Sequence, residues 1–123
     1  MTKLIRQILV SGLTMLVLDG VYISMIKKDF TDQIINIQRV AMTIRWAGVF
    51  VCYFFLIFGL NYFIIGKSRS IMEAFYFGLV IYAVYESTNY ATLKNWTAKI
   101  AIIDTLWGGT LMALTTYITY RLV

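Results

Sequence analysis

The sequence predicts an all-α integral membrane protein, a four-transmembrane-helix bundle with a short amphipathic surface helix between helices one and two. Of its 123 residues, 60% are hydrophobic and 14% are charged, and the mean hydropathy is +0.76. A soluble domain has about 45–50% apolar and about 25% charged residues, so this balance indicates a bilayer environment. Because proline is absent and turn clusters are few, helices are favoured over a β-barrel. The length allows a single membrane domain over residues 1–123.

The residue types that are missing exclude several kinds of site. Histidine is absent and Cys52 is the single cysteine, which excludes histidine bases, histidine metal ligands and intramolecular disulfides. Cys52 stands among aromatic residues in Phe50–Phe54, where we expect a buried core residue. The net charge is +5, but the basic residues stand at the ends of apolar segments, which indicates lipid headgroups and no nucleic-acid partner. No cofactor is identified and no metal site is assigned.

The first span is expected over about residues 4–26, although Asp19 interrupts its apolar run. Basic residues before this run resemble a signal peptide, but Asp19 and the lack of a small-residue cleavage site before Lys27–Lys28 favour a retained span. The polar stretch Lys27–Thr43 repeats apolar residues at helical spacing, which is typical of a short helix lying on the membrane surface. The alternative is a helical extension of the next span.

Three further spans are expected at about residues 44–65, 71–93 and 100–120. The polar turn Gly66–Ser70 makes the second and third spans antiparallel neighbours. Four spans leave both termini on the same side of the membrane. The positive-inside rule gives no orientation, because the basic residues are divided almost evenly between the two sides.

Three carboxylates are predicted to lie at one depth in the bilayer. Asp19 and Glu86 each lie about 22 Å along spans that enter from the side of the termini. Asp104 lies about 8 Å into a span that enters from the opposite side. In a hydrocarbon core of about 30 Å these levels nearly coincide. A charged group at the centre of a membrane helix costs about 2.5 kcal/mol or more, so the three carboxylates indicate a shared role.

Residues that share helix faces with these carboxylates complete the candidate site. Three acidic groups with an amide suit a hard cation, and a carboxyl group can relay protons. The leading interpretation is therefore small-cation or proton handling, with a homo-oligomer as a candidate assembly because four helices barely enclose a pathway. The site consists of Asp19, Glu86, Asn89 and Asp104, supported by Tyr22, Tyr82, Thr88, Thr92, Lys94 and Trp107.

Two other interpretations stay open. The protein could be a membrane enzyme or binder that acts on lipid headgroups or an isoprenoid, so enzymatic activity is left undecided. Alternatively, the carboxylates form a polar clamp in a structural or assembly protein, hydrogen-bonded to Tyr, Trp, Asn or Thr. Interhelical hydrogen bonds in membranes contribute only about 0.6–2 kcal/mol each.

Three blocks of the sequence resemble the Domain of Unknown Function 2177 family of small membrane proteins. These blocks are Leu18–Tyr22, Tyr85–Trp96 and Asp104–Gly109. The chain departs from the family pattern at Glu86, where Asp is more usual, and at Thr97, where proline is common. The resemblance implies a four-helix integral membrane fold and implies no particular chemistry.

Overall fold

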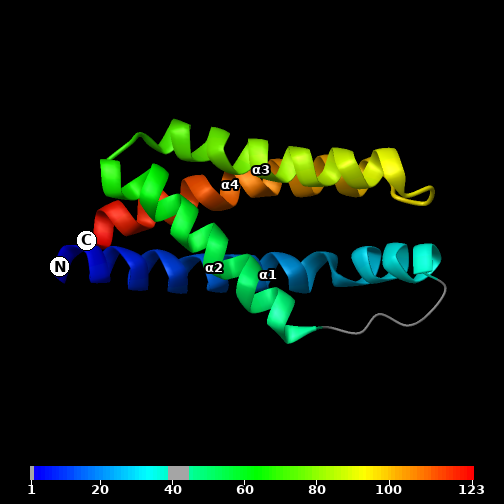
Figure 1. Ribbon diagram of the computed structural model, residues 1–123, viewed down its shortest axis with the longest axis horizontal. Coiled ribbons are helices and arrows are strands. Elements are labelled where there is room, and N and C mark those ends of the chain that lie inside the picture. Colours follow the sequence, from blue (N-terminus) through cyan, green and yellow to red (C-terminus); the bar gives the residue numbers. More distant parts are fainter. Residues whose placement is uncertain (1, 39–44) are drawn as a thin grey trace.

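The computed structural model describes residues 2–38 and 45–123, and over these residues the chain is helical without strands. The predicted all-α class is confirmed. Both ends of the chain lie at the same end of the bundle (Figure 1). The elements are α1 (Thr2–Gln38), α2 (Trp46–Phe63), the short 3-10 helix η1 (Ile65–Lys67), α3 (Ile71–Thr92) and α4 (Ala98–Leu122).

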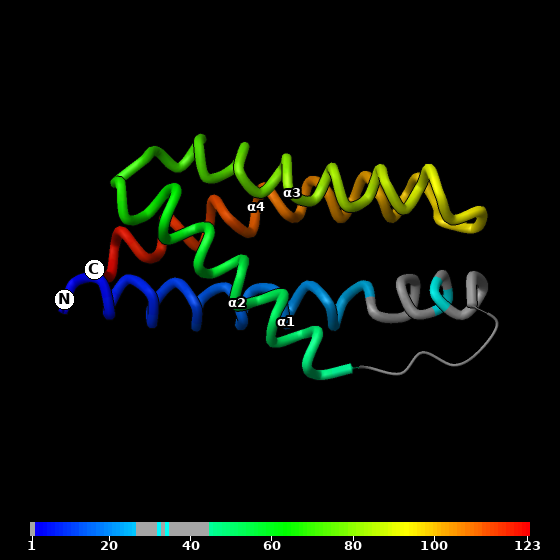
Figure 2. The backbone as a smooth tube through the Cα atoms, in the orientation of Figure 1, coloured from blue at the N-terminus to red at the C-terminus, as the bar shows by residue number. Residues whose placement is uncertain are grey.

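The helices pack unequally. α3 and α4 form an antiparallel pair that stays in contact along its length, and α4 also packs on α1. The path of the backbone in Figure 2 shows α2 running obliquely across α1. Among the residues of α2, only Gly59, Leu60 and Asn61 are buried, all near its C-terminal end. The first half of α2 is therefore held by few contacts.

The expected surface helix between the first two spans is not a separate element. Residues 27–38 continue α1 without a break, and residues 39–43 lie outside the described residues. The segment therefore extends the preceding helix, whereas the alternative interpretation had joined it to the following one. The sequence from Val21 to Gln38 contains no glycine or proline, so nothing interrupts helix propagation, which is easier than starting a new helix.

Side-chain caps fix where α3 and α4 begin. The Ser70 hydroxyl accepts a hydrogen bond from the backbone N–H of Glu73 at 3.1 Å, and Glu73 also pairs with Arg69 at 3.2 Å. At the start of α4 the Thr97 hydroxyl accepts from the backbone N–H of Ile100 at 3.3 Å. Threonine is a good N-cap residue because its oxygen satisfies a donor that the first helical turn leaves unpaired. Thr97 thus defines the helix start.

Glycines allow the backbones of α3 and α4 to approach closely. A Cβ on Gly78 would overlap the carbonyl of Gly108, and a Cβ on Gly108 would overlap the ring of Tyr82. Small residues at membrane-helix contacts permit this kind of packing, in which van der Waals contact replaces the hydrophobic drive available in water. The close approach brings the carboxyl-bearing faces of both helices together.

Apolar side chains lie exposed along every α-helix of the described chain. Within that part, two stretches are long and apolar enough to cross a membrane, Thr2–Ile26 in α1 and Trp46–Lys67 in α2 and η1. Cys52 lies on the open side of α2 and is exposed, so the expected buried core position is wrong. The reason is that α2 packs on the bundle near its C-terminal end and leaves most of its surface uncovered.

We expect Gly78→Ala to lower the thermal unfolding temperature of the protein in detergent. Overpacking a tight contact costs about 1–3 kcal/mol, because the backbones must separate or shift. The matched control is Gly20→Ala in the interior of α1, where an added Cβ meets nothing within 4 Å. That variant should unfold at the parent temperature or slightly above it. Equal unfolding temperatures for both variants would contradict the close packing of α3 on α4.

Candidate functional site

Asp19 is held by two aromatic side chains from other helices. It lies in the middle of α1 and is 7% exposed. The indole N–H of Trp107 in α4 donates to its Oδ1 at 2.9 Å, and the hydroxyl of Tyr53 in α2 donates to its Oδ2. Both carboxyl oxygens of Asp19 thus have a neutral donor, which replaces the water that a carboxylate would lose inside a membrane.

A parallel contact ties α1 to α4 one helical turn away. The Tyr22 hydroxyl donates to Oδ1 of Asp104 at 3.1 Å. The Tyr22 ring stacks on Trp107, with ring centroids 4.7 Å apart and planes within 7°. Stacking fixes the two rings, so the Tyr22 hydroxyl points to Asp104 and the Trp107 indole N–H points to Asp19. We call Asp19, Tyr22, Tyr53, Asp104 and Trp107 the carboxylate–aromatic cluster.

Glu86 is the most deeply buried of the three predicted carboxylates. It lies on α3 and is 1% exposed. The indole N–H of Trp96, in the turn between α3 and α4, donates to its Oε1 at 2.8 Å. The other oxygen, Oε2, is buried and has no hydrogen-bond partner within the described part of the chain. Glu86 is therefore positioned by one donor, and its carboxyl group also interacts with that of Asp104.

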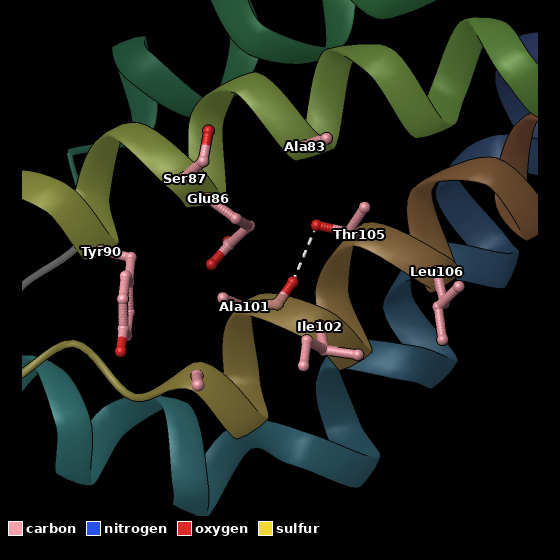
Figure 3. A pocket seen from close by; sticks show the side chains of 9 residues that line it. Ala83, Glu86, Ser87, Tyr90, Ala101, Ile102, Thr105 and Leu106 are labelled. Carbon is pink, nitrogen blue, oxygen red and sulfur yellow. Dashed lines mark hydrogen bonds between the residues drawn. The ribbon is translucent and has the colours of Figure 1, made fainter.

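A pocket of about 350 Å³ lies beside Glu86, between α3 and α4. Figure 3 shows the Glu86 side chain pointing from α3 into the space between the two helices. The Thr105 hydroxyl on the opposite wall donates to the carbonyl of Ala101 at 2.7 Å, so it is already used within α4. The pocket, which we call the α3/α4 pocket, is lined by Ala83, Glu86, Ser87, Tyr90, Ala98, Ala101, Ile102, Thr105 and Leu106.

The supporting residues of the sequence-based site are distributed unevenly. Tyr82 is half-buried against Gly108, next to the cluster. Asn89 is half-buried, one turn beyond Glu86. The Thr88 and Thr92 hydroxyls are exposed and donate to carbonyls of their own helix, at 2.7 and 2.8 Å. Lys94 is exposed in the turn after α3.

The structure therefore brings some of the expected residues together and separates others. The Tyr22 hydroxyl contacts Asp104, and Asp19 and Glu86 lie within electrostatic range of it. Thr88, Thr92 and Lys94 are not part of this arrangement, because the first two bond within α3 and the third is exposed.

Two important donors were not in the sequence-based site. Tyr53 was missed because α2 is apolar on every side, so no polar stripe singles out one of its residues. Trp96 stands between the third and fourth expected spans, where an interfacial tryptophan is common in membrane proteins and needs no special partner. Its burial, at 4% exposed, is the property that the sequence did not reveal.

Hydrogen-bond donors surround the three carboxylates. Over residues 2–38 and 45–123, no group of three or more His, Cys, Asp or Glu residues is placed to hold a metal ion. The partners of the three carboxylates are instead hydroxyl and indole donors. Such donors orient a carboxyl group.

Comparison with known proteins gives a family and no activity. The family model described as a predicted membrane protein, DUF2177, matches residues 4–121. The chain belongs to this family. The DUF2177 match spans all three carboxylates and both indole donors, so the site lies within the part that defines the family. No curated protein and no solved structure matches the chain.

We expect Trp107→Phe to lower the unfolding temperature, because the ring can still stack on Tyr22 while Oδ1 of Asp19 loses its donor. Leaving one buried polar atom unpaired costs about 1–3 kcal/mol. Tyr76→Phe is the control, since Tyr76 is 56% exposed and lies outside the carboxylate–aromatic cluster. Thermal unfolding of both variants in detergent gives the comparison. If Trp107→Phe is as stable as Tyr76→Phe, the bond to Asp19 contributes nothing to the fold.

Proposed function

We propose that this protein is a multi-pass membrane protein that binds an apolar ligand with one polar group in the α3/α4 pocket. The carrying observation is the unpartnered Oε2 of Glu86, a buried acceptor on the wall of an otherwise mostly apolar pocket. Ligand pockets are usually apolar, with a few polar groups that fix the orientation of the ligand. Glu86 fits that role because Trp96 holds its other oxygen.

The chemistry of the pocket narrows the ligand class. Its volume of about 350 Å³ falls at the lower end of the range of about 300–1,000 Å³ for small-molecule pockets. Alanine, isoleucine and leucine side chains suit a hydrocarbon body, and the free carboxyl oxygen suits a hydroxyl or amine donor. An isoprenoid alcohol or another hydroxyl-bearing lipid combines both features. This matches the lipid or isoprenoid interpretation of the sequence.

The proposal includes four membrane spans, with α3 and α4 crossing beside α1 and α2. α3 has 22 residues and α4 has 25, which is long enough for a core of about 30 Å. Their polar residues lower the mean hydropathy, but Glu86 is buried against the bundle and α4 places its threonines at 115, 116 and 119 inside. With both chain ends at one end of the bundle, the termini share one side of the membrane.

Binding is tested with farnesol, an isoprenoid alcohol, and farnesene, a similar hydrocarbon without the hydroxyl group. We expect farnesol to raise the unfolding temperature of the parent more than farnesene does. A ligand at one hundred times its Kd stabilises a protein by about 2.7 kcal/mol. In Glu86→Leu the difference between the two compounds should disappear, because the acceptor is gone.

Tyr76→Phe is the control for this experiment. Tyr76 is 56% exposed and does not line the α3/α4 pocket, so this variant should still distinguish farnesol from farnesene. Ala83→Leu, which narrows the pocket, should weaken the response to both compounds. An equal response of the parent to farnesol and farnesene, or a Glu86→Leu variant that behaves as the parent, contradicts the proposal.

Small-cation or proton handling is the second candidate. It is favoured by Tyr22, whose hydroxyl donates to Asp104 while lying within range of Asp19 and Glu86. We expect proton or potassium flux into liposomes that contain the parent, and lower flux with Asp104→Asn and with Glu86→Gln. Tyr76→Phe serves as the control. Flux that is absent, or equal in all four proteins, argues against this function.

A further inference from the structure

A second and larger hollow lies at the other end of the bundle, between α1 and α2. Its volume is about 700 Å³, twice that of the α3/α4 pocket. It belongs to the end that holds both chain termini and the turn after α2 (Figure 1). We call it the α1/α2 groove, and it is lined by Leu4, Ile8, Phe54, Ile57, Phe58, Asn61, Tyr62, Gly66 and Lys67.

The walls of the groove change from apolar to polar along its length. Leu4 and Ile8 from α1 face Phe54, Ile57 and Phe58 from α2, and all of them are hydrocarbon or aromatic. The polar lining residues Asn61 and Lys67 come later in the chain, at the end of α2 and in η1. This order resembles the profile of a phospholipid, which has an apolar chain below a charged head.

The Lys67 ammonium group is held in place beside the groove. Its Nζ lies over the Tyr62 ring, 4.5 Å from the centroid, and 5.7 Å from the centroid of Phe63. Cation–π contacts of this kind contribute about 0.5–1 kcal/mol at exposed sites. In the described part of the chain Lys67 forms no ion pair, whereas its neighbour Arg69 is paired with Glu73 at 3.2 Å. Lys67 therefore offers an uncompensated positive charge.

Basic residues surround this end of the bundle more generally. Lys3 and Arg6 are exposed in the first turns of α1, and Arg121 is exposed at the end of α4. Basic pockets between membrane helices attract anionic lipid headgroups, by about 1 kcal/mol for each Lys or Arg near the surface. The charge of this end thus complements a negative headgroup and disfavours a second copy of the same basic surface.

Asn61 adds an unused acceptor at the polar end of the groove. Its Nδ2 donates to the Ser11 hydroxyl at 2.9 Å and to the Ile57 carbonyl at 2.8 Å. Its Oδ1 is buried, and within the described ranges it has no hydrogen-bond partner. Buried polar atoms in native proteins usually have a partner, so an unpaired acceptor beside a groove marks a place where a donor is missing.

We propose that the α1/α2 groove binds one phospholipid with an anionic headgroup. An acyl chain lies along Ile8, Phe54 and Phe58, and the headgroup phosphate pairs with the Lys67 ammonium. A hydroxyl-bearing headgroup, such as that of phosphatidylglycerol, also supplies a hydrogen-bond donor for Oδ1 of Asn61 at the polar end of the groove. The site is independent of Glu86 and lies at the opposite end of the bundle.

The test measures lipid retained by the purified full-length protein. The protein is reconstituted in bilayers of equal parts phosphatidylglycerol and phosphatidylcholine, extracted in mild detergent, and examined by native mass spectrometry. We expect bound phosphatidylglycerol to exceed phosphatidylcholine by about fivefold, the factor that corresponds to about 1 kcal/mol for one basic residue. Lys67→Gln should bring the ratio close to one, and Lys67→Arg should keep it.

Two further variants complete the design. Lys99→Gln removes an exposed lysine at the start of α4, at the other end of the bundle, and should keep the parent ratio. Ile57→Trp fills the groove and should lower the retention of both lipids. Thermal unfolding identifies any variant that fails to fold. If Ile57→Trp fails to fold, the comparison of Lys67→Gln with Lys67→Arg and Lys99→Gln still tests the role of the charge. Equal retention of the two lipids by the parent, or the same loss with Lys99→Gln as with Lys67→Gln, overturns the proposal.

Discussion

The hydrogen bonds to Asp19 are the interaction on which the arrangement of the helices depends. A carboxylate in the middle of a membrane helix is costly unless donors replace its water shell. Trp107 and Tyr53 supply those donors from α4 and α2. Tyr53 thus joins α2 to α1 at Asp19, and the hydrogen bond from Asn61 to Ser11 joins the same two helices nearer the C-terminal end of α2.

Asp19 and Glu86 look equivalent in the sequence, but they differ in how many of their oxygens have a hydrogen-bond donor. Asp19 has a donor on each oxygen, whereas Glu86 has one donor and one unused acceptor. A carboxyl group whose two oxygens both have donors mainly holds helices together, because neither oxygen is left to accept a bond from a ligand. A carboxyl group with a donor on one oxygen is held in a fixed orientation, and its other oxygen can still accept a hydrogen bond. The contacts of Asp19 are those expected of a clamp, whereas the binding proposal concerns Glu86, which lies outside the carboxylate–aromatic cluster.

The two ends of the bundle differ in chemistry. At the end that carries the α3–α4 turn, a small apolar pocket surrounds a single carboxyl group. At the end that carries both termini, a larger groove leads to an exposed lysine. The two hollows thus differ in the polar group that borders them, a carboxyl group in one and an ammonium group in the other.

The sequence by itself determined the all-α membrane class, because composition and helical periodicity depend only on local residue choice. It also singled out Asp19, Glu86 and Asp104, since a charge in an apolar run is visible without a structure. Only the tertiary structure decided which donors meet these carboxylates. Tyr53 lies on a helix that is apolar on all sides, and its partner stands 34 residues away in the chain. The continuation of α1 to Gln38, the exposure of Cys52 and the free oxygen of Glu86 likewise depend on how the helices pack, which local periodicity does not encode.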